Sequence, residues 1–193
     1  MLVDRCLEGE QAAARDLFRR QQSRVQATLF RILGRNREIE DLLQETFIQV
    51  FRSLRNYRGE ARLSTWIDRI AVRVAYRYLS KNKTAALTTQ LVEEAASPSG
   101  SPARRSYARE GVRRLYAALA ELSPTLRIAF MLHEIDRRSI VNVADCVGAS
   151  PTAAKLRVWR ARRALHKRAQ SDAILRDFLT CGNESPGSEG ATS

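Results

Sequence analysis

Apolar side chains recur at intervals of three and four residues along most of this chain, and this spacing constrains the fold more than any other feature. The clearest run has a polar and charged opposite face and consists of Ile39, Leu42, Leu43, Thr46, Phe47, Val50, Phe51 and Leu54. Such spacing places the apolar positions on one face of an α-helix. No segment shows the sustained alternation of a half-buried strand, so the sequence predicts an all-α protein with no sheet.

Ser, Pro and Gly residues interrupt this pattern between residues 95 and 102. A stretch of this composition buries too little apolar surface to order itself. We therefore expect two small helical domains, 1–83 and 109–170, joined by a flexible linker over 84–108 and followed by a disordered acidic tail over 171–193. The two expected domains carry net charges of +7 and +8, whereas the linker is neutral and the tail is acidic.

The second basic block has the sequence features of a helix-turn-helix. Ser123 followed by Pro124 is typical of a helix start, and Ser139 can cap a short helix. Gly148 then predicts a tight turn before a helix that begins at Pro151. That helix carries no acidic residue up to position 168 and seven basic ones, namely Lys155, Arg157, Arg160, Arg162, Arg163, Lys167 and Arg168. Such a helix can contact DNA in the major groove, although the solvated face of a structural helix would have the same composition.

Composition narrows the function classes. Lys and Arg number 33 against 21 Asp and Glu, with a pI near 10.6, which favours a polyanionic partner such as DNA; a basic membrane-surface helix is the competing interpretation. The sequence contains no run of about 20 apolar residues, the length needed to span a bilayer, and acidic residues interrupt any signal peptide at its start. We therefore expect a cytoplasmic protein without membrane insertion. The three cysteines and two histidines are scattered, so we expect no metal, no cofactor and no catalysis. Redox sensing by a cysteine is a minor alternative.

Four short segments form two recognisable motif pairs. Residues 41–47 read DLLQETF and residues 57–67 read YRGEARLSTWI. Residues 119–124 read LAELSP and residues 155–165 read KLRVWRARRAL. The first pair is similar to region two of the extracytoplasmic-function (ECF) group of RNA polymerase sigma factors, and the second pair is similar to region four of that family, with its promoter-reading helix-turn-helix. The resemblance implies an all-α factor that binds core RNA polymerase, recognises the −35 and −10 promoter elements and catalyses nothing itself.

The resemblance also implies roles for individual residues. In the family, the DLLQE helix docks on the beta-prime clamp of the polymerase, which implies Asp41, Gln44 and Glu45 as polymerase contacts; a merely solvated acidic face is the alternative. The family further implies a contact with the polymerase beta flap and an anti-sigma partner that holds the protein inactive.

Promoter contacts are implied in both predicted domains. Trp66 can stack on an unstacked base of the −10 element or can belong to the core. The implied −10 set is Asn56, Tyr57, Arg58, Leu63, Ser64, Thr65, Trp66, Arg69 and Arg73. The implied −35 set is Ser150, Thr152, Lys155, Arg157, Trp159, Arg160 and Arg163.

The chain departs from the family pattern in several places. Leu63 stands where Phe is frequent, and Arg137 stands where Gly precedes the helix-turn-helix. Thr152, Ala153 and Leu156 replace small polar residues early in the reading helix, so the preferred −35 sequence does not follow from the family.

Two other function classes stay open. One is a helix-turn-helix regulator that binds DNA without polymerase, which leaves the motifs in residues 1–83 unexplained. The other is an enzyme such as a nuclease, for which the sequence offers neither a Gly-rich phosphate loop nor clustered carboxylates beyond the helix face from Glu38 to Glu45.

Overall fold

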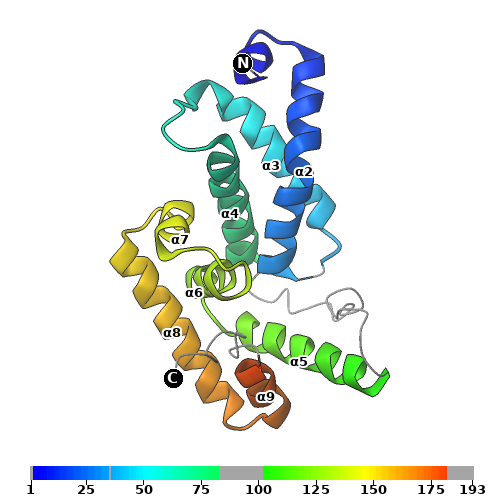
Figure 1. Ribbon diagram of the computed structural model, residues 1–193, viewed down its shortest axis with the longest axis vertical. Coiled ribbons are helices and arrows are strands. Elements are labelled where there is room, and N and C mark those ends of the chain that lie inside the picture. The colour runs from blue at the N-terminus through cyan, green and yellow to red at the C-terminus, as the bar shows by residue number, and fades with distance from the viewer. Residues whose placement is uncertain (1, 35, 83–101, 182–193) are drawn as a thin grey trace, which may run out of the picture.

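The computed structural model describes residues 2–34, 36–82 and 102–181, and in these ranges the protein is helical with no strand, as the sequence predicts (Figure 1). Residues 2–82, the N-terminal domain, form α1 (Leu2–Leu7), α2 (Gln11–Leu33), α3 (Ile39–Ser53), the 3-10 turn η1 (Leu54–Asn56) and α4 (Leu63–Lys81). Residues 102–181, the C-terminal domain, form α5 (Pro102–Ala120), α6 (Pro124–Phe130), the π-helical turn η2 (Met131–Ile135), α7 (Ile140–Val147), α8 (Pro151–Ala169) and α9 (Ala173–Cys181). None of the helices in the described ranges combines the length and apolar character needed to cross a bilayer.

The N-terminal domain is a three-helix packing of α2, α3 and α4, with the short α1 against α2. Its core is formed by the apolar stripes of these helices, including Leu29, Phe47 and Ile67, all almost fully buried. The amphipathic pattern between Ile39 and Leu54 therefore does mark a helix with one buried face. Leu54 itself belongs to the 3-10 turn that ends it.

The C-terminal domain contains the predicted helix-turn-helix. The Ser139 hydroxyl accepts from the Asn142 backbone N–H, and the Ser150 hydroxyl accepts from that of Ala153, so α7 and α8 each start with a side-chain cap. Gly148 ends α7 in the left-handed conformation, with φ of 61°, which a glycine adopts without steric strain. These local signals place α8 across α7 and α6.

Two boundaries differ from the sequence prediction. Residues 102–108, expected in the linker, form the first turns of α5, and residues 173–181, expected in a disordered tail, form α9. The helix α9 is ordered because it packs on α5 and α8, where Leu175 is buried and Asp172 pairs with Arg114 at 2.9 Å. The remaining parts of the expected linker and tail, 83–101 and 182–193, lie outside the described residues.

Helix starts in the N-terminal domain also differ. The apolar spacing from Ala13 to Leu33 predicts two shorter helices that end at Gly34, whereas the structure has a single helix α2 preceded by α1. The residue type of Ser64 predicts a helix cap, but Ser64 lies inside α4, and Arg62 occupies the capping position without a side-chain cap bond. Continuous packing along α4 keeps α2 helical without a break.

The two domains pack against each other, a feature that the sequence analysis did not predict. Helix α4 contacts α6 and α7, and α2 contacts η2. Val72 on α4 and Ile128 on α6 are both buried in one hydrophobic cluster that continues through both domains. Figure 1 shows α4 standing directly against the α6–α7 end of the C-terminal domain.

Candidate nucleic-acid interface

Helix α8 presents most of the predicted −35 residues on one open face. Six of the seven are exposed, namely Ser150, Thr152, Lys155, Trp159, Arg160 and Arg163. Trp159 is 52% exposed, and the Arg163 guanidinium lies 5.4 Å from the centre of its ring, a cation–π contact that holds both side chains in place. This face combines cationic groups with a flat apolar surface, which suits phosphates and base edges in a major groove.

Arg157, the seventh predicted −35 residue, does not lie on this face. It is half-buried and lines a cavity between the two domains, together with Arg69 and Arg73 of α4. A neighbouring arginine that was not assigned to DNA, Arg162, pairs with Glu134 at 2.7 Å and so has a structural partner. The structure therefore brings six of the predicted −35 residues together and separates Arg157 from them.

The loop before α4 brings two predicted −10 aromatic residues together. The rings of Tyr57 and Trp66 lie 5.4 Å apart at an angle of 55°, and the Tyr57 hydroxyl donates to the Ala61 carbonyl at 2.8 Å. Trp66 is half-buried and packs against the core, so part of its ring is packing surface and part is accessible, and stacking on a −10 base stays a prediction. Asn56 and Arg58 of the same loop are exposed, whereas Leu63, Ser64 and Thr65 are half-buried.

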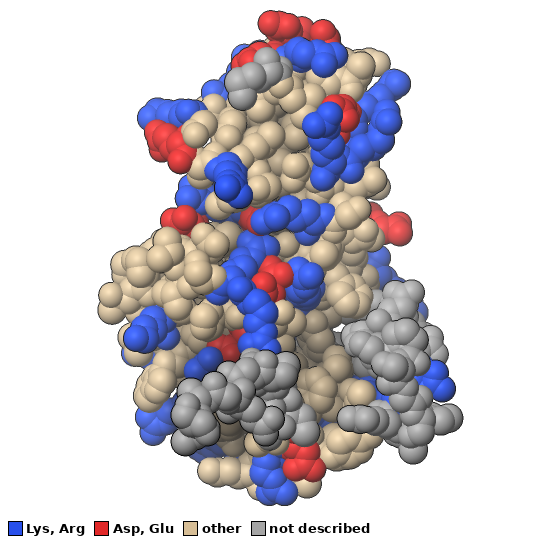
Figure 2. All heavy atoms as spheres, in the orientation of Figure 1, with Lys and Arg blue, Asp and Glu red and all other residues tan. Residues whose placement is uncertain are grey.

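Arg69 and Arg73 form a basic ridge on α4 that borders the C-terminal domain. Arg69 Nη2 lies 3.6 Å from the Asp145 carboxylate of α7, and Arg69 Nε is buried without a hydrogen-bond partner among the described residues. Arg73 is exposed and borders the same cavity, which has a volume of about 490 Å³. The cavity is lined by Trp66, Arg69, Val72, Arg73, Tyr76, Thr125, Ile128, Asp145, Cys146, Val147, Gly148 and Arg157. On the face of the molecule drawn in Figure 2, Lys and Arg side chains gather across the middle, where the two domains meet.

The predicted polymerase-binding face of α3 is open to solvent. Asp41, Gln44 and Glu45 are all exposed, and Glu45 is oriented by Gln49, which donates to it at 2.6 Å. An apolar residue outside the predicted contact set lies on the same face: Ile48, four residues after Gln44, is 44% exposed. The signal was present, because Ile48 falls outside the apolar stripe of α3. Phe51, which the stripe predicts as buried, is also exposed.

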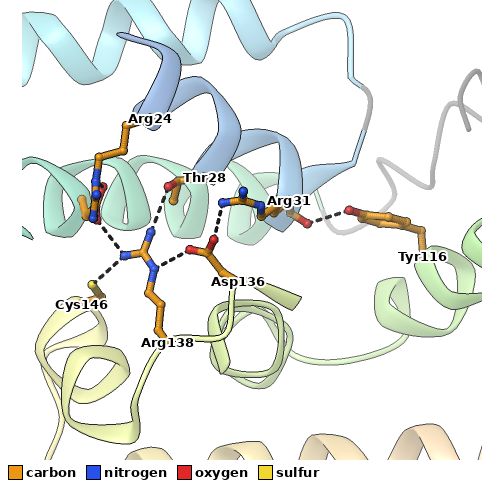
Figure 3. A network of polar contacts seen from close by, with 8 residues as sticks. Arg24, Thr28, Arg31, Tyr116, Asp136, Arg138 and Cys146 are labelled. Atoms are coloured by element: carbon orange, nitrogen blue, oxygen red, sulfur yellow. Dashed lines mark hydrogen bonds and ion pairs between the residues drawn. The ribbon is translucent and has the colours of Figure 1, made fainter. Parts of the chain in front are cut away.

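A polar network joins the two domains (Figure 3). Asp68 of α4 is 1% exposed and accepts from Arg24 of α2 at 2.7 Å and from Arg138, before α7, at 2.8 Å. Arg138 also donates to Thr28 of α2 at 3.1 Å and to the Asp136 carboxylate. Asp136 in turn accepts from Arg31 of α2. These five contacts connect α2, α4 and the segment before α7, which are far apart in the sequence.

The thiol of Cys146 lies at the edge of this network, 3.4 Å from Arg138 Nη1. Burial raises the pKa of this thiol above its ordinary value, which disfavours the reactive thiolate at neutral pH. Among the described residues no group of three or more His, Cys, Asp or Glu side chains is placed to hold a metal ion.

Comparison with known proteins agrees with both helical domains. Residues 17–84 match the family model for Sigma-70 region 2, and residues 112–165 match that for Sigma-70, region 4. Over 178 residues the chain is 28% identical to the ECF RNA polymerase sigma-E factor of Haemophilus influenzae, covering 88% of this chain and 94% of that protein. It is 27% identical to the protein of the same description from Escherichia coli over 179 residues, covering 88% and 93%.

Solved structures show the same fold. CnrH in complex with the cytosolic domain of CnrY superposes with a TM-score of 0.61 at 20% identity, covering 89% of this chain and 96% of that one. The sigma factor RpoE in complex with the anti-sigma factor NepR from Bartonella quintana superposes with a TM-score of 0.56 at 20% identity, covering 82% and 97%.

Proposed function

The chain belongs to the ECF group of RNA polymerase sigma factors, and from that premise we propose that it binds core RNA polymerase, recognises −35 and −10 promoter elements and supports the initiation of transcription. The observation that carries the residue assignment is the open face of α8, where six predicted contacts lie together on a doubly capped helix-turn-helix. A regulator acting without polymerase would need only this part of the chain. The region 2 match over residues 17–84 favours the sigma factor.

The two DNA contacts divide between the domains. The exposed face of α8, from Ser150 to Arg163, reads the −35 element as duplex. The loop from Asn56 to Leu63, with Tyr57 and Trp66 at its base, receives the −10 strand, and Arg69 and Arg73 hold its phosphates. Support comes from the chemistry of the two faces, since stacking surfaces next to arginines suit an unstacked single strand and an open basic helix suits a groove.

The polymerase contact lies on α3. Asp41, Gln44 and Glu45 supply charge-assisted hydrogen bonds to a basic partner, and Ile48 adds apolar area one turn further along the same face. We place the contact on the beta-prime clamp, with a second contact between the C-terminal domain and the beta flap. The protein acts in the cytoplasm, where polymerase and chromosome are.

An anti-sigma factor is a further proposed partner. Two solved structures that share this fold are complexes, one with the cytosolic domain of CnrY and one with the anti-sigma factor NepR. The family resemblance supports an equivalent inhibitor for this chain.

Run-off transcription with purified core polymerase on a fragmented genomic library tests the proposal. We expect discrete transcripts that require this protein and that map promoters with a common −35 element. Specific duplex binding without any transcript would favour the regulator instead.

The α3 assignment has its own test. The double variant Gln44→Ala with Glu45→Ala should weaken core binding in a pull-down while leaving the helical circular-dichroism signal unchanged. The matched control is Glu8→Ala with Gln11→Ala, an exposed pair of the same residue types away from α3, which should bind core polymerase like the wild type. Wild-type affinity in the α3 variant would remove this face as the docking site.

A further inference from the structure

The boundary between the domains is built around a buried charge. Asp68 lies within the apolar side of α4, at 1% exposure, so its carboxylate has lost its hydration. Its partners come from both sides of the boundary: Arg24 belongs to its own domain, whereas Arg138 belongs to the other one (Figure 3). A buried charge is tolerated only when it is paired, so separating the domains removes one of the two cations that compensate Asp68.

A second contact closes the boundary from the other end. Helix α2 ends at Leu33, and its last carbonyls have no partner within the helix. Arg127 of α6, 5% exposed, donates Nε to the Ile32 carbonyl at 2.9 Å and Nη2 to the Leu33 carbonyl at 3.0 Å. The Tyr116 hydroxyl of α5 donates to the Arg31 carbonyl at 2.8 Å. The C-terminal domain thus caps the negative end of α2 with a cation and a phenol.

This closed arrangement partly covers the α4 surface that we assign to the −10 strand, because Arg69 faces α7 whereas Arg73 stays exposed. The Asp145 carboxylate of α7 lies 3.6 Å from the Arg69 guanidinium. A phosphate approaching Arg69 would therefore meet the like charge of Asp145. The α8 face is not affected, because Lys155, Trp159 and Arg160 are exposed in the same closed structure.

We propose that the domain contact is autoinhibitory: closure, held by the Asp68–Arg138 pair and by the capping of α2, competes with binding of single-stranded DNA on α4. The free protein can contact duplex through α8 but must separate its domains before α4 receives a strand. Any partner that binds only the separated form shifts the equilibrium toward it by its differential affinity. The identity of α4 as a DNA surface rests on the proposed function, whereas closure by Arg138 does not.

The test compares two arginines that share one acceptor. In the full-length protein, Arg138→Met removes the cation across the boundary, and Arg24→Met removes the one within the N-terminal domain; each change lowers the net charge by one. Small-angle X-ray scattering measures domain separation, and fluorescence anisotropy measures binding of a fluorescein-labelled 12-nucleotide oligothymidine.

We expect Arg138→Met to increase the radius of gyration and to tighten oligonucleotide binding about tenfold, equivalent to about 1.4 kcal/mol. Loss of a positive charge alone would weaken binding, so the expected change has the opposite sign to simple electrostatics. Arg24→Met should keep the wild-type scattering profile and bind slightly less tightly. Adding Arg69→Ala and Arg73→Ala to Arg138→Met should abolish the gain.

Other results overturn the proposal. An unchanged radius of gyration in Arg138→Met shows that the pair does not hold the domains, and separation without tighter binding shows that closure does not compete with DNA. If Arg138→Met loses its helical signal, Tyr116→Phe supplies the same test at the second contact, with a smaller separation expected. Failure to support transcription with core polymerase would contradict the proposed function while leaving the scattering result intact.

Discussion

Helices α4 and α8 carry the two proposed DNA surfaces and differ in how they are covered. Both contain 19 residues, and both have arginines spaced along one side. The basic side of α8 faces solvent, whereas that of α4 faces α7 and a cavity of about 490 Å³. Two helices with basic sides thus give one surface that is open in the closed protein and one that is partly covered.

The difference in coverage between α4 and α8 originates in their acidic residues. Helix α8 contains no acidic residue, so nothing in it attracts cations from the rest of the protein. Helix α4 contains Asp68 one residue before Arg69, and this carboxylate recruits Arg138 from the other domain. One buried acid therefore contributes to holding α7 against Arg69, together with the apolar cluster and the contacts at the end of α2.

The two tryptophans of the chain give the largest test of this contrast, since each helix carries one. Trp66→Ala removes a half-buried ring packed on Tyr57 and should lower the free energy of unfolding by about 2–3 kcal/mol. Trp159→Ala removes a ring that is 52% exposed and should change stability by less than about 0.5 kcal/mol. Urea denaturation followed by circular dichroism measures both values.

In duplex-DNA binding, the order of the two tryptophan variants should be reversed, with the larger loss in Trp159→Ala. Trp159→Ala should weaken binding to duplex that carries the −35 element, and Trp66→Ala should instead reduce permanganate-reactive thymines in the open complex. A pre-melted template should rescue Trp66→Ala. If Trp66→Ala weakens duplex binding as much as Trp159→Ala does, the division of roles between α4 and α8 is wrong.

The cationic face of α8 gives the next largest effect. Lys155→Ala or Arg160→Ala should weaken duplex binding by about 1–3 kcal/mol if the side chain makes a bidentate base contact. A phosphate contact would instead lower affinity for all sequences and flatten the salt dependence. Competition binding at several salt concentrations separates the two cases. Arg162→Ala is the matched control on the same helix, because Glu134 already holds Arg162, and it should have the smallest effect of the three.

Sequence patterns predicted the fold class and the helix-turn-helix because those features depend on short-range signals. The cap at Ser139, the turn at Gly148 and the helix start at Pro151 each depend on a few neighbouring residues, and all three are confirmed. The expectation of a disordered tail was wrong for residues 173–181, which form α9. A signal was present, because Ile174, Leu175, Phe178 and Leu179 recur at helical spacing and Asp172 accepts from the Leu175 backbone N–H. Packing against α5 and α8 buries Leu175 and supplies the stability that so short a helix lacks on its own.

The covering of α4 could not be predicted from local patterns. Asp68 and Arg138 are 70 residues apart, and each is an ordinary charged residue in its own segment. A partial signal exists, because Asp68 lies among the buried positions Ile67, Ile70 and Ala71, where an unpaired carboxylate would be unfavourable. That signal predicts a cationic partner without saying which one. The exclusion of Arg157 from the α8 face has the same origin, since only the packed domains show the cavity that it lines.

Gly148 allows a smaller test, at the turn that sets α8 apart from α7. Its φ of 61° is unfavourable for other residues, and a Cβ there would meet no atom within 4 Å. Gly148→Ala should therefore lower the free energy of unfolding by about 1 kcal/mol through backbone strain alone. Denaturant midpoints measure this change. A loss several times larger would mean that the turn shifts and takes α8 with it, which duplex binding would then also report.

Tyr116 gives the smallest effect at neutral pH and probes the boundary that covers α4. Burial raises the pKa of its phenol from the ordinary value of 10.0 to about 12. Below pH 10 the phenol is neutral in the folded and unfolded protein, so its titration does not affect stability. Between pH 10 and 12 the unfolded chain loses this proton while the folded protein keeps it, so the free energy of unfolding falls as the pH rises. Absorbance at 295 nm should therefore show a late-titrating component, and Tyr116→Phe should remove it. In Arg138→Met, where we expect the domains to separate, the late component should move toward pH 10. A phenol that titrates normally in the wild type would mean that the α2 end of the boundary is open in solution, and α4 would then be as accessible as α8.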